Sequence, residues 1–284
     1  MKIWAKIRAN GEYHSQNIAH AAFGFMELGA EIVKYEKIAD IINWVTLYDI
    51  VLDYIDQCNT IFNKFGVTPY VPDYPEQFNE FLGRKIWKDN INSISLNESK
   101  WSRGTFVKPV KDKVFTGKVI QSLADLVGCG SCYENYEVYV SEAVDIKAEW
   151  RCFILYDNII DIRPYGANVI TNRNESWKYH YDYKVVESML EKFREWEDRP
   201  VACSMDIAVI DTDIPVKIVR EDENGNEIIV GWRTRPNYKT ILVEFNDAYA
   251  LGNYGLQALS YAKLISARWS QLLNRPDEFN FLIK

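Results

Sequence analysis

The sequence predicts a mixed fold class, in which an N-terminal α/β part is followed by an α+β part with antiparallel strands. A strand, an amphipathic helix and a second strand fill residues 2–36, and this β-α-β order is typical of a small parallel sheet. From about residue 104 onward, strand-like runs follow one another closely. The length of 284 residues allows one large domain or two to three packed lobes, and a hydrophobic content of 48% is enough for a core.

The front part alternates strands and helices. Residues 15–29 carry apolar side chains at helical spacing, and Gly29 is placed to end that helix. A proline at position 75 is typical of a helix start. The expected elements are a strand at 2–7, a helix at 15–29, a strand at 31–36, helices at 50–64 and 75–87, and a polar linker at 92–104.

The second part is rich in strands. Tyr156, Asp157 and Asn158 form a plausible hairpin turn between two of them, and Asn224-Gly225 marks another hairpin. The expected strands are "TFVKPV" (105–110), "EVYVSEAV" (137–144), "EWRCFILYDNIIDIRPYG" (149–166) and "ACSMDIAVIDT" (202–212), with a hairpin at 216–232 and helices at 185–196 and 255–273.

Charge and cysteine content exclude some classes of protein. Lys and Arg total 33 and Asp and Glu 40, so a net charge of −7 argues against broad binding to nucleic acid or anionic membranes. No apolar run approaches 18 residues, and the N-terminus lacks the apolar segment of a signal peptide. Five irregularly spaced cysteines indicate reduced thiols and a cytoplasmic protein. Cys129 and Cys132 form a CxxC without further ligands nearby, which favours a plain turn over a metal site.

The stretch "ILVEFNDAYALGNYGL" (241–256) is a candidate metal strand. Alternation places Glu244 and Asn246 on one face and Val243 and Phe245 on the other. A carboxylate and an amide at this spacing suit Mg²⁺, and Asp206 in "SMDIAVID" is a further candidate ligand. The alternative is a strand end with solvated polar side chains.

The stretch "FVKPVKDKVFTGKVI" (106–120) is a candidate phosphate-binding hairpin. Lys108, Lys111, Lys113 and Lys118 are mobile positive charges, and Gly117 allows backbone N–H groups to approach a phosphate. The order of residues is not that of a Walker A loop. An ordinary exposed basic hairpin is the alternative.

The stretch "EVYVSEAVDIKAEWRCFIL" (137–155) places a buried-looking arginine after a strand bracketed by Glu137 and Glu142. Arg151 lies among apolar residues, which favours a specific anionic partner. A cross-strand ion pair with Glu149 or another carboxylate is an equal alternative.

In chain order, these stretches run from the lysine hairpin through the Glu-bracketed strand and Arg151 to Asp206 and the Glu244–Asn246 strand. This order resembles the ATP-grasp superfamily, and within it the RimK-like branch and its R2K clade. "YVSEAVDIKAEWRCFIL" and "VEFND" carry the resemblance, which covers roughly residues 104 to 270. It implies an ATP-grasp fold, with an N-terminal α/β domain at 1–100 and an ATP-grasp domain at 101–284. The latter would consist of a small lid lobe (101–140) and a large metal-binding lobe (141–284), with antiparallel sheets that clamp ATP.

The resemblance also implies a role for individual residues. Lys108 would contact the α- and β-phosphates, and the loop from Lys113 to Lys118 would cover them. Arg151 and Arg163 would face the transferred phosphate. The adenine hinge would consist of Glu137, Val138, Tyr139 and Val140, with Glu142 near the ribose, and the metal ligands would be Asp206, Glu244 and Asn246.

The implied activity is Mg²⁺-dependent ligation of a carboxylate to an amine, with ATP consumed through an acyl phosphate. The usual ending of the metal strand is replaced by "NDAYALGNYGL", Ser141 replaces a lysine and Glu149 an aspartate. The acceptor is therefore left open between a free amino acid, a peptide and a protein tail, and the oligomeric state is open too. Asp247 would join the metal site, bind an amine or cap a turn.

Two other functions compete with this one. The first is a nucleotide-binding regulatory or interaction module without ligase activity. The second is nucleic-acid binding, which needs a basic aromatic groove. Residues 173–184 form the one patch of that composition, so no nucleic-acid partner is expected.

Overall fold

The computed structural model of the protein describes residues 1–111, 114–129, 134–165, 178–221 and 227–280. Its contacts divide the chain into two units. The first contains residues 1–78, 147–209 and 242–284, and the second contains residues 79–146 and 210–241. Residues 79–146 belong to the second unit, and the predicted domain limits at residues 100 and 140 stay a prediction.

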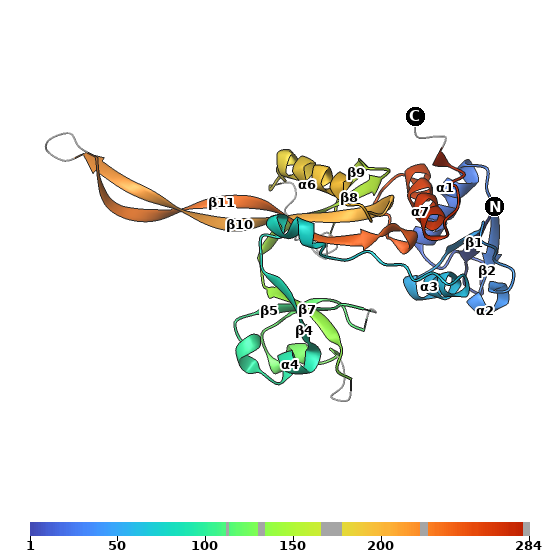
Figure 1. The fold of residues 1–284 in the computed structure, drawn as a ribbon, viewed down its shortest axis with the longest axis horizontal. Helices are drawn as coiled ribbons and strands as arrows, with labels where there is room; N and C mark the ends of the chain where they lie inside the picture. The colour runs from blue at the N-terminus through green and yellow to red at the C-terminus, as the bar shows by residue number, and fades with distance from the viewer. Residues whose placement is uncertain (112–113, 130–133, 166–177, 222–226, 281–284) are drawn as a thin grey trace. The chain divides into compact units, whose positions relative to one another are not determined.

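A parallel sheet of order β2-β1-β3 opens the first unit (Figure 1). Its strands are β1 (Lys2–Lys6), β2 (Glu31–Tyr35) and β3 (Ile50–Leu52). Helix α1 (Gln16–Glu27) joins the first two, so the predicted β-α-β unit is present. Ser15 caps α1 by accepting a hydrogen bond from the Ile18 N–H, and Gly29 follows its end at a φ of +81°.

The prediction of a helix over 50–64 was wrong at its start. Residues 50–52 form β3, whose three residues are buried beside β1, and helix α3 (Ile55–Lys64) begins only after it. A short apolar run that is buried on both faces has no alternation to mark it as a strand. The short helix α2 (Ile38–Ile41) precedes β3.

Helix α7 (Ala258–Leu272), the predicted closing helix, packs against α1. Gly24 of α1 makes this approach possible, because a Cβ at this position would overlap the carbonyl group of Ala258. The segment that leads into α7 includes the short 3₁₀ helix η4 (Ala248–Ala250).

A second sheet, of order β11-β10-β8-β9, carries the carboxylates and arginines singled out above. Strands β8 (Ile146–Leu155) and β9 (Asn158–Pro164) form the predicted hairpin, and Tyr156 and Asp157 turn it with φ angles of 47° and 64°. Helix α6 (Tyr183–Glu195) buries Val186, Met189 and Phe193, as its periodicity predicts. The remaining strands of the sheet are β10 (Ala202–Glu221) and β11 (Glu227–Asp247).

The second unit contains an antiparallel sheet of order β4-β7-β5-β6. Its strands are β4 (Ile86–Asn90), β5 (Thr105–Pro109), β6 (Lys118–Ile120) and β7 (Glu137–Glu142). Around it lie helix α4 (Ile91–Ser95) and the 3₁₀ helices η2 (Glu98–Lys100) and η3 (Leu123–Leu126).

Two front-part predictions were wrong here. The helix expected at 75–87 is the 3₁₀ helix η1 (Glu76–Phe81) followed by β4, since Gly83 takes a φ of +64° that interrupts a helix. The expected linker at 92–104 includes most of α4, because Ile91 and Ile94 are buried in the core with Val107.

Strands β10 and β11 continue into the second unit as residues 210–221 and 227–241, in the region of the predicted hairpin (Figure 1). The predicted turn at Asn224-Gly225 lies outside the described residues, as does Cys132. No helix in the part of the chain that the structure describes has both the length and the apolar composition to cross a bilayer.

Candidate functional site

The β11-β10-β8-β9 sheet presents polar residues on four neighbouring strands. Glu244 and Asn246 lie on β11, Asp206 on β10, Arg151 on β8 and Arg163 on β9. Arg151 and Arg163 are direct partners in the antiparallel register, so their side chains leave the same face. Residues that are up to 95 positions apart in the sequence, from 151 to 246, therefore form a row on one sheet of the first unit.

The centre of this row is a buried ion pair. Arg151 Nε donates to Asp206 Oδ1 at 2.8 Å and Arg151 Nη2 to Asp206 Oδ2 at 2.6 Å, and both side chains are almost fully buried. The observed partner of Arg151 is thus another carboxylate, Asp206, and its proposed role toward an anionic ligand stays a prediction. Two parallel hydrogen bonds make this the strong bidentate form of such a pair.

Asn246 connects Asp206 to the second carboxylate of the row, Glu244. Its Nδ2 donates to Asp206 Oδ2 at 3.0 Å and to Glu244 Oε1 at 3.1 Å. Burial raises the pKa of Asp206, and the nearby charge of Glu244 raises it further, while Arg151 acts in the opposite direction. Two carboxylates therefore meet around one amide in a poorly solvated place.

These three side chains fit a hard cation. The repulsion between Asp206 and Glu244 would be relieved by positive charge between them, and an amide turned by 180° presents Oδ1 in place of Nδ2. In the described ranges no group of three His, Cys, Asp or Glu side chains could hold a metal ion. Two carboxylates and an amide suit Mg²⁺, which usually completes its shell with water and phosphate oxygens.

Two tyrosines that the sequence reading missed enclose Arg151. The guanidinium carbon lies 3.9 Å from the ring centre of Tyr165 and 4.9 Å from that of Tyr254, and the two rings meet edge to face. Tyr254 has a φ of +41°, an uncommon conformation for a large residue, in the loop where the sequence departs from the ATP-grasp pattern that it resembles. The Gly-Asn-Tyr-Gly sequence is the one signal that could have drawn attention to it.

Arg163, at the end of the row, and Asp247, next to Asn246, have local ion-pair partners. Arg163 binds Asp161 of its own strand, through Nε at 2.8 Å and Nη2 at 2.7 Å, and its side chain is partly exposed. Asp247 pairs with Arg268 of α7 through two contacts of 2.7 Å and accepts a hydrogen bond from the Tyr249 N–H at the start of η4. Of the alternatives for Asp247, the structure favours the capping role.

The nucleotide-binding candidates lie in the second unit. Lys108 of β5 pairs in register with Tyr139 of β7, so the proposed phosphate lysine and the proposed hinge strand are neighbours. Val138 and Val140 point into the core and are fully buried. A ligand at this strand could therefore be contacted only by backbone groups of residues 137–140 or by side chains on the opposite face of β7.

The rest of that set is spread along the same sheet. Gly117 lies against β5: a Cβ there would come within 2.7 Å of the Phe106 ring and 3.2 Å of Lys108 Cβ. Lys118 donates to the Val127 carbonyl at 3.0 Å. Glu137 forms a half-exposed ion pair with Lys88, and Glu142 accepts from the Lys85 N–H at 3.2 Å. Lys113 lies outside the described residues.

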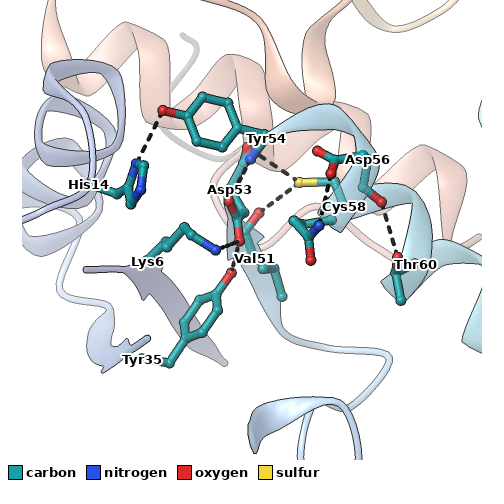
Figure 2. A network of polar contacts seen from close by, with 10 residues as sticks. Lys6, His14, Tyr35, Val51, Asp53, Tyr54, Asp56, Cys58 and Thr60 are labelled. Atoms are coloured by element: carbon teal, nitrogen blue, oxygen red, sulfur yellow. Dashed lines mark hydrogen bonds and ion pairs between the residues drawn. The ribbon is translucent and has the colours of Figure 1, made fainter. Parts of the chain in front are cut away.

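A further polar cluster lies at the carboxyl ends of the parallel strands (Figure 2). The buried Asp53 accepts hydrogen bonds from Lys6 Nζ at 3.1 Å, the Tyr35 hydroxyl at 2.6 Å and the Tyr54 N–H at 2.8 Å. Burial raises the pKa of Tyr35, and its bond to Asp53 adds to the effect. Nearby, His14 Nδ1 lies 3.1 Å from the Tyr54 hydroxyl, so this histidine has a local partner.

Asp53→Ala is expected to lower the free energy of unfolding by about 3 kcal/mol, because it leaves a buried hydroxyl and a poorly solvated ammonium without their acceptor. Urea unfolding measures this change. Tyr35→Phe removes one donor only and should cost about 1 kcal/mol. Equal losses in the two variants would contradict a central role for the carboxylate.

Residues 81–264 match the family described as ATP-grasp domain, R2K clade family 2. The chain belongs to this R2K family. The match spans more than half of the 284 residues and confirms both the predicted ATP-grasp fold and the predicted clade. Membership supports ATP-dependent ligation in general terms.

Two solved structures resemble this R2K protein in fold. A RimK domain ATP-grasp protein from Sphaerobacter thermophilus has a TM-score of 0.51, and D-alanine–D-alanine ligase from Bacillus anthracis has one of 0.50. Each is 10% identical, and each match covers 96% of this chain and 98% of the other. No curated protein matches the sequence significantly. At this identity the likeness concerns the fold alone.

Proposed function

We propose that this R2K protein is a Mg²⁺-dependent ligase that joins a carboxylate to an amine at the expense of ATP. The observation that carries the proposal is the row on β11, β10 and β8, where Asn246 bridges Glu244 and Asp206 and Asp206 binds Arg151. Such a row combines acidic ligands for a cation with a guanidinium for an anion, in a family that uses ATP.

The first unit would handle the metal and the transferred phosphate. Glu244, Asn246 and Asp206 would hold Mg²⁺, which supplies charge neutralisation for the phosphates when bound. Arg151 and Arg163, on the same face of the sheet, would bind the anionic groups that carry the developing charge. Tyr165 and Tyr254 keep the Arg151 guanidinium in place.

The residues proposed to contact the nucleotide belong to the second unit. Lys108 would contact the α- and β-phosphates, and Lys113, Gly117 and Lys118 would belong to the loop that covers them. The backbone of Glu137 to Val140 would meet the adenine and Glu142 the ribose. The register of Lys108 with Tyr139 and the core positions of Val138 and Val140 support this assignment.

The reaction would proceed in two steps. A substrate carboxylate oxygen attacks the γ-phosphorus of ATP, which gives an acyl phosphate and ADP. An amine then attacks the acyl carbon, loses a proton and expels phosphate. No side-chain nucleophile is needed, and burial raises the pKa of Cys152 and Cys203 thiols, which keeps them unreactive.

Ligand-dependent stabilisation tests the nucleotide site. With Mg²⁺ and ADP together at a hundred times the Kd, the protein should gain about 2.7 kcal/mol, which raises Tm by roughly 5–10 °C. Mg²⁺ alone and ADP alone should give smaller shifts, since each would lack part of its binding partner. No shift with any nucleotide would remove the proposal.

A nucleotide-binding module without ligase activity is the second candidate. It is favoured by one observation: both oxygens of Asp206, a proposed metal ligand, are engaged by Arg151. Mass-spectrometric screening with mixtures of carboxylates and amines separates the two. An ATP-dependent product identifies a ligase, whereas tight Mg²⁺–ADP binding without product or ADP release identifies the module.

A further inference from the structure

The parts of β10 and β11 in the second unit, residues 210–221 and 227–241, form a ribbon with unusually exposed apolar side chains (Figure 1). Val230 is 47% exposed and Trp232 is 60% exposed. The other large apolar residues exposed on the ribbon are Ile214, Ile218, Val219, Ile228, Ile229 and Tyr238. A two-stranded ribbon is marginally stable in water, and an apolar patch of this kind marks a surface that a partner covers.

Three contacts fix how the two strands of the ribbon face each other. Asn237 Nδ2 donates to Thr212 Oγ1 at 3.3 Å, the Lys217 ammonium lies 5.9 Å from the Trp232 ring, and Ile218 Cδ1 would be 3.7 Å from a Cβ at Gly231. All three pairs have the same register. One face of the ribbon therefore carries Ile228, Val230 and Trp232, and the other carries Ile229 and Gly231 beside Ile218.

Strand β11 has an open edge. Within the described part of the chain, β10 is its one strand neighbour, so the N–H and C=O groups on its far side are available for pairing. The segment Glu227–Arg233, "EIIVGWR", lies on this edge with its apolar side chains exposed.

This segment is complementary to itself. In an antiparallel pair of two copies centred on Val230, Ile228 faces Trp232 and Val230 faces Val230, so one face is apolar throughout. On the other face Glu227 meets Arg233, and Ile229 fills the space above Gly231. Opposite charges and aromatic–aliphatic pairs are favourable across strands, and a shift by one residue would lose both.

We infer that the β11 edge at residues 227–233 binds the same segment of a second copy of this chain, so that two ribbons join in a four-stranded sheet of order β10-β11-β11-β10. The pairing is isologous, as a two-fold dimer requires. It joins the exposed apolar faces and pairs the open edges. The ribbon thereby gains the further strands and the buried apolar surface that an isolated two-stranded ribbon does not have.

Sedimentation velocity over a wide range of protein concentration tests this inference. The wild-type protein should reach twice the mass of one chain. Val230→Lys places two ammonium groups opposite each other at the centre of the pairing, so it should stay monomeric. Tyr238→Lys is the matched control: it lies on the same strand and face and is 49% exposed, but it is outside the segment, so it should still dimerise.

A charge exchange tests the register independently of folding. Glu227→Arg or Arg233→Glu alone sets like charges opposite each other twice per dimer and should weaken association at least about tenfold. The double variant Glu227→Arg/Arg233→Glu should restore it. A wild-type protein that stays monomeric, a Val230→Lys variant that dimerises like Tyr238→Lys, or a double variant that remains as weak as the single ones would each overturn the inference.

Discussion

Glu244→Ala is expected to abolish ADP formation while the protein remains folded. The carboxylate contacts Asn246 and lies close enough to Asp206 to raise its pKa, so its removal takes away one of the two carboxylates that are proposed to hold the metal. Even the outer partners of metal ligands contribute about 10–100-fold to metal affinity or activity. For a direct ligand the rate should therefore fall by more than about 100-fold, as measured by ADP release with Mg²⁺ and ATP.

Stability separates this effect from unfolding. Loss of Glu244 also removes a repulsion on the buried Asp206, so the urea midpoint should stay near the wild-type value. The Mg²⁺-dependent part of the nucleotide-induced Tm shift should disappear in the same variant. Glu195→Gln, an exposed carboxylate on α6, is the control and should leave both measurements unchanged. Wild-type turnover in Glu244→Ala would remove this residue from the proposed metal site.

Arg151→Met is expected to lower the free energy of unfolding by about 3–5 kcal/mol, because it leaves Asp206 buried without its counter-charge. Replacement of both partners, as in Arg151→Met/Asp206→Leu, should recover most of this loss, since an apolar pair of similar volume needs no compensation. The double variant should still form no ADP. Recovered stability without ADP formation in the double variant would show that the ion pair contributes separately to folding and to activity.

The pH dependence of the Arg151→Met variant follows from the same carboxylate. Burial already raises the pKa of Asp206, and loss of the arginine should raise it further. A carboxyl group whose pKa is higher in the folded than in the unfolded state contributes stability at low pH, and this contribution is lost as pH rises through the folded pKa. The difference from the wild type should thus widen as pH rises above the ordinary carboxyl range, and a constant difference in urea unfolding would contradict it.

The sequence predicted most of what short-range patterns can reveal. Alternation placed Glu244 and Asn246 on one face, and they are hydrogen-bonded to each other. The pairing of Arg151 with Asp206 was left open because 55 residues separate them, and the sequence contains no register between β8 and β10. Tyr165 carries no pattern at all. Its ring meets Arg151 because of a sheet edge and a loop that come together only in the folded chain.

The two strands that the sequence did not predict were missed for the same reason. Residues 50–52 and 86–90 are short strands that are specified by their neighbours β1 and β7, and neither contains enough alternation to be recognised alone. Longer elements, such as α1 and α6, were predicted well because each turn of an amphipathic helix repeats the same signal.

The amide of Asn246 gives the acidic site a resting state of its own. Its Nδ2 donates a hydrogen bond to each of Asp206 and Glu244, and so bridges two carboxylates that repel each other. Rotation about a single side-chain torsion would exchange that donor for an acceptor when a cation arrives. If the proposed metal site is correct, the protein would therefore stay folded at low magnesium and bind the ion without rebuilding its sheet, so that magnesium concentration would control activity and not stability.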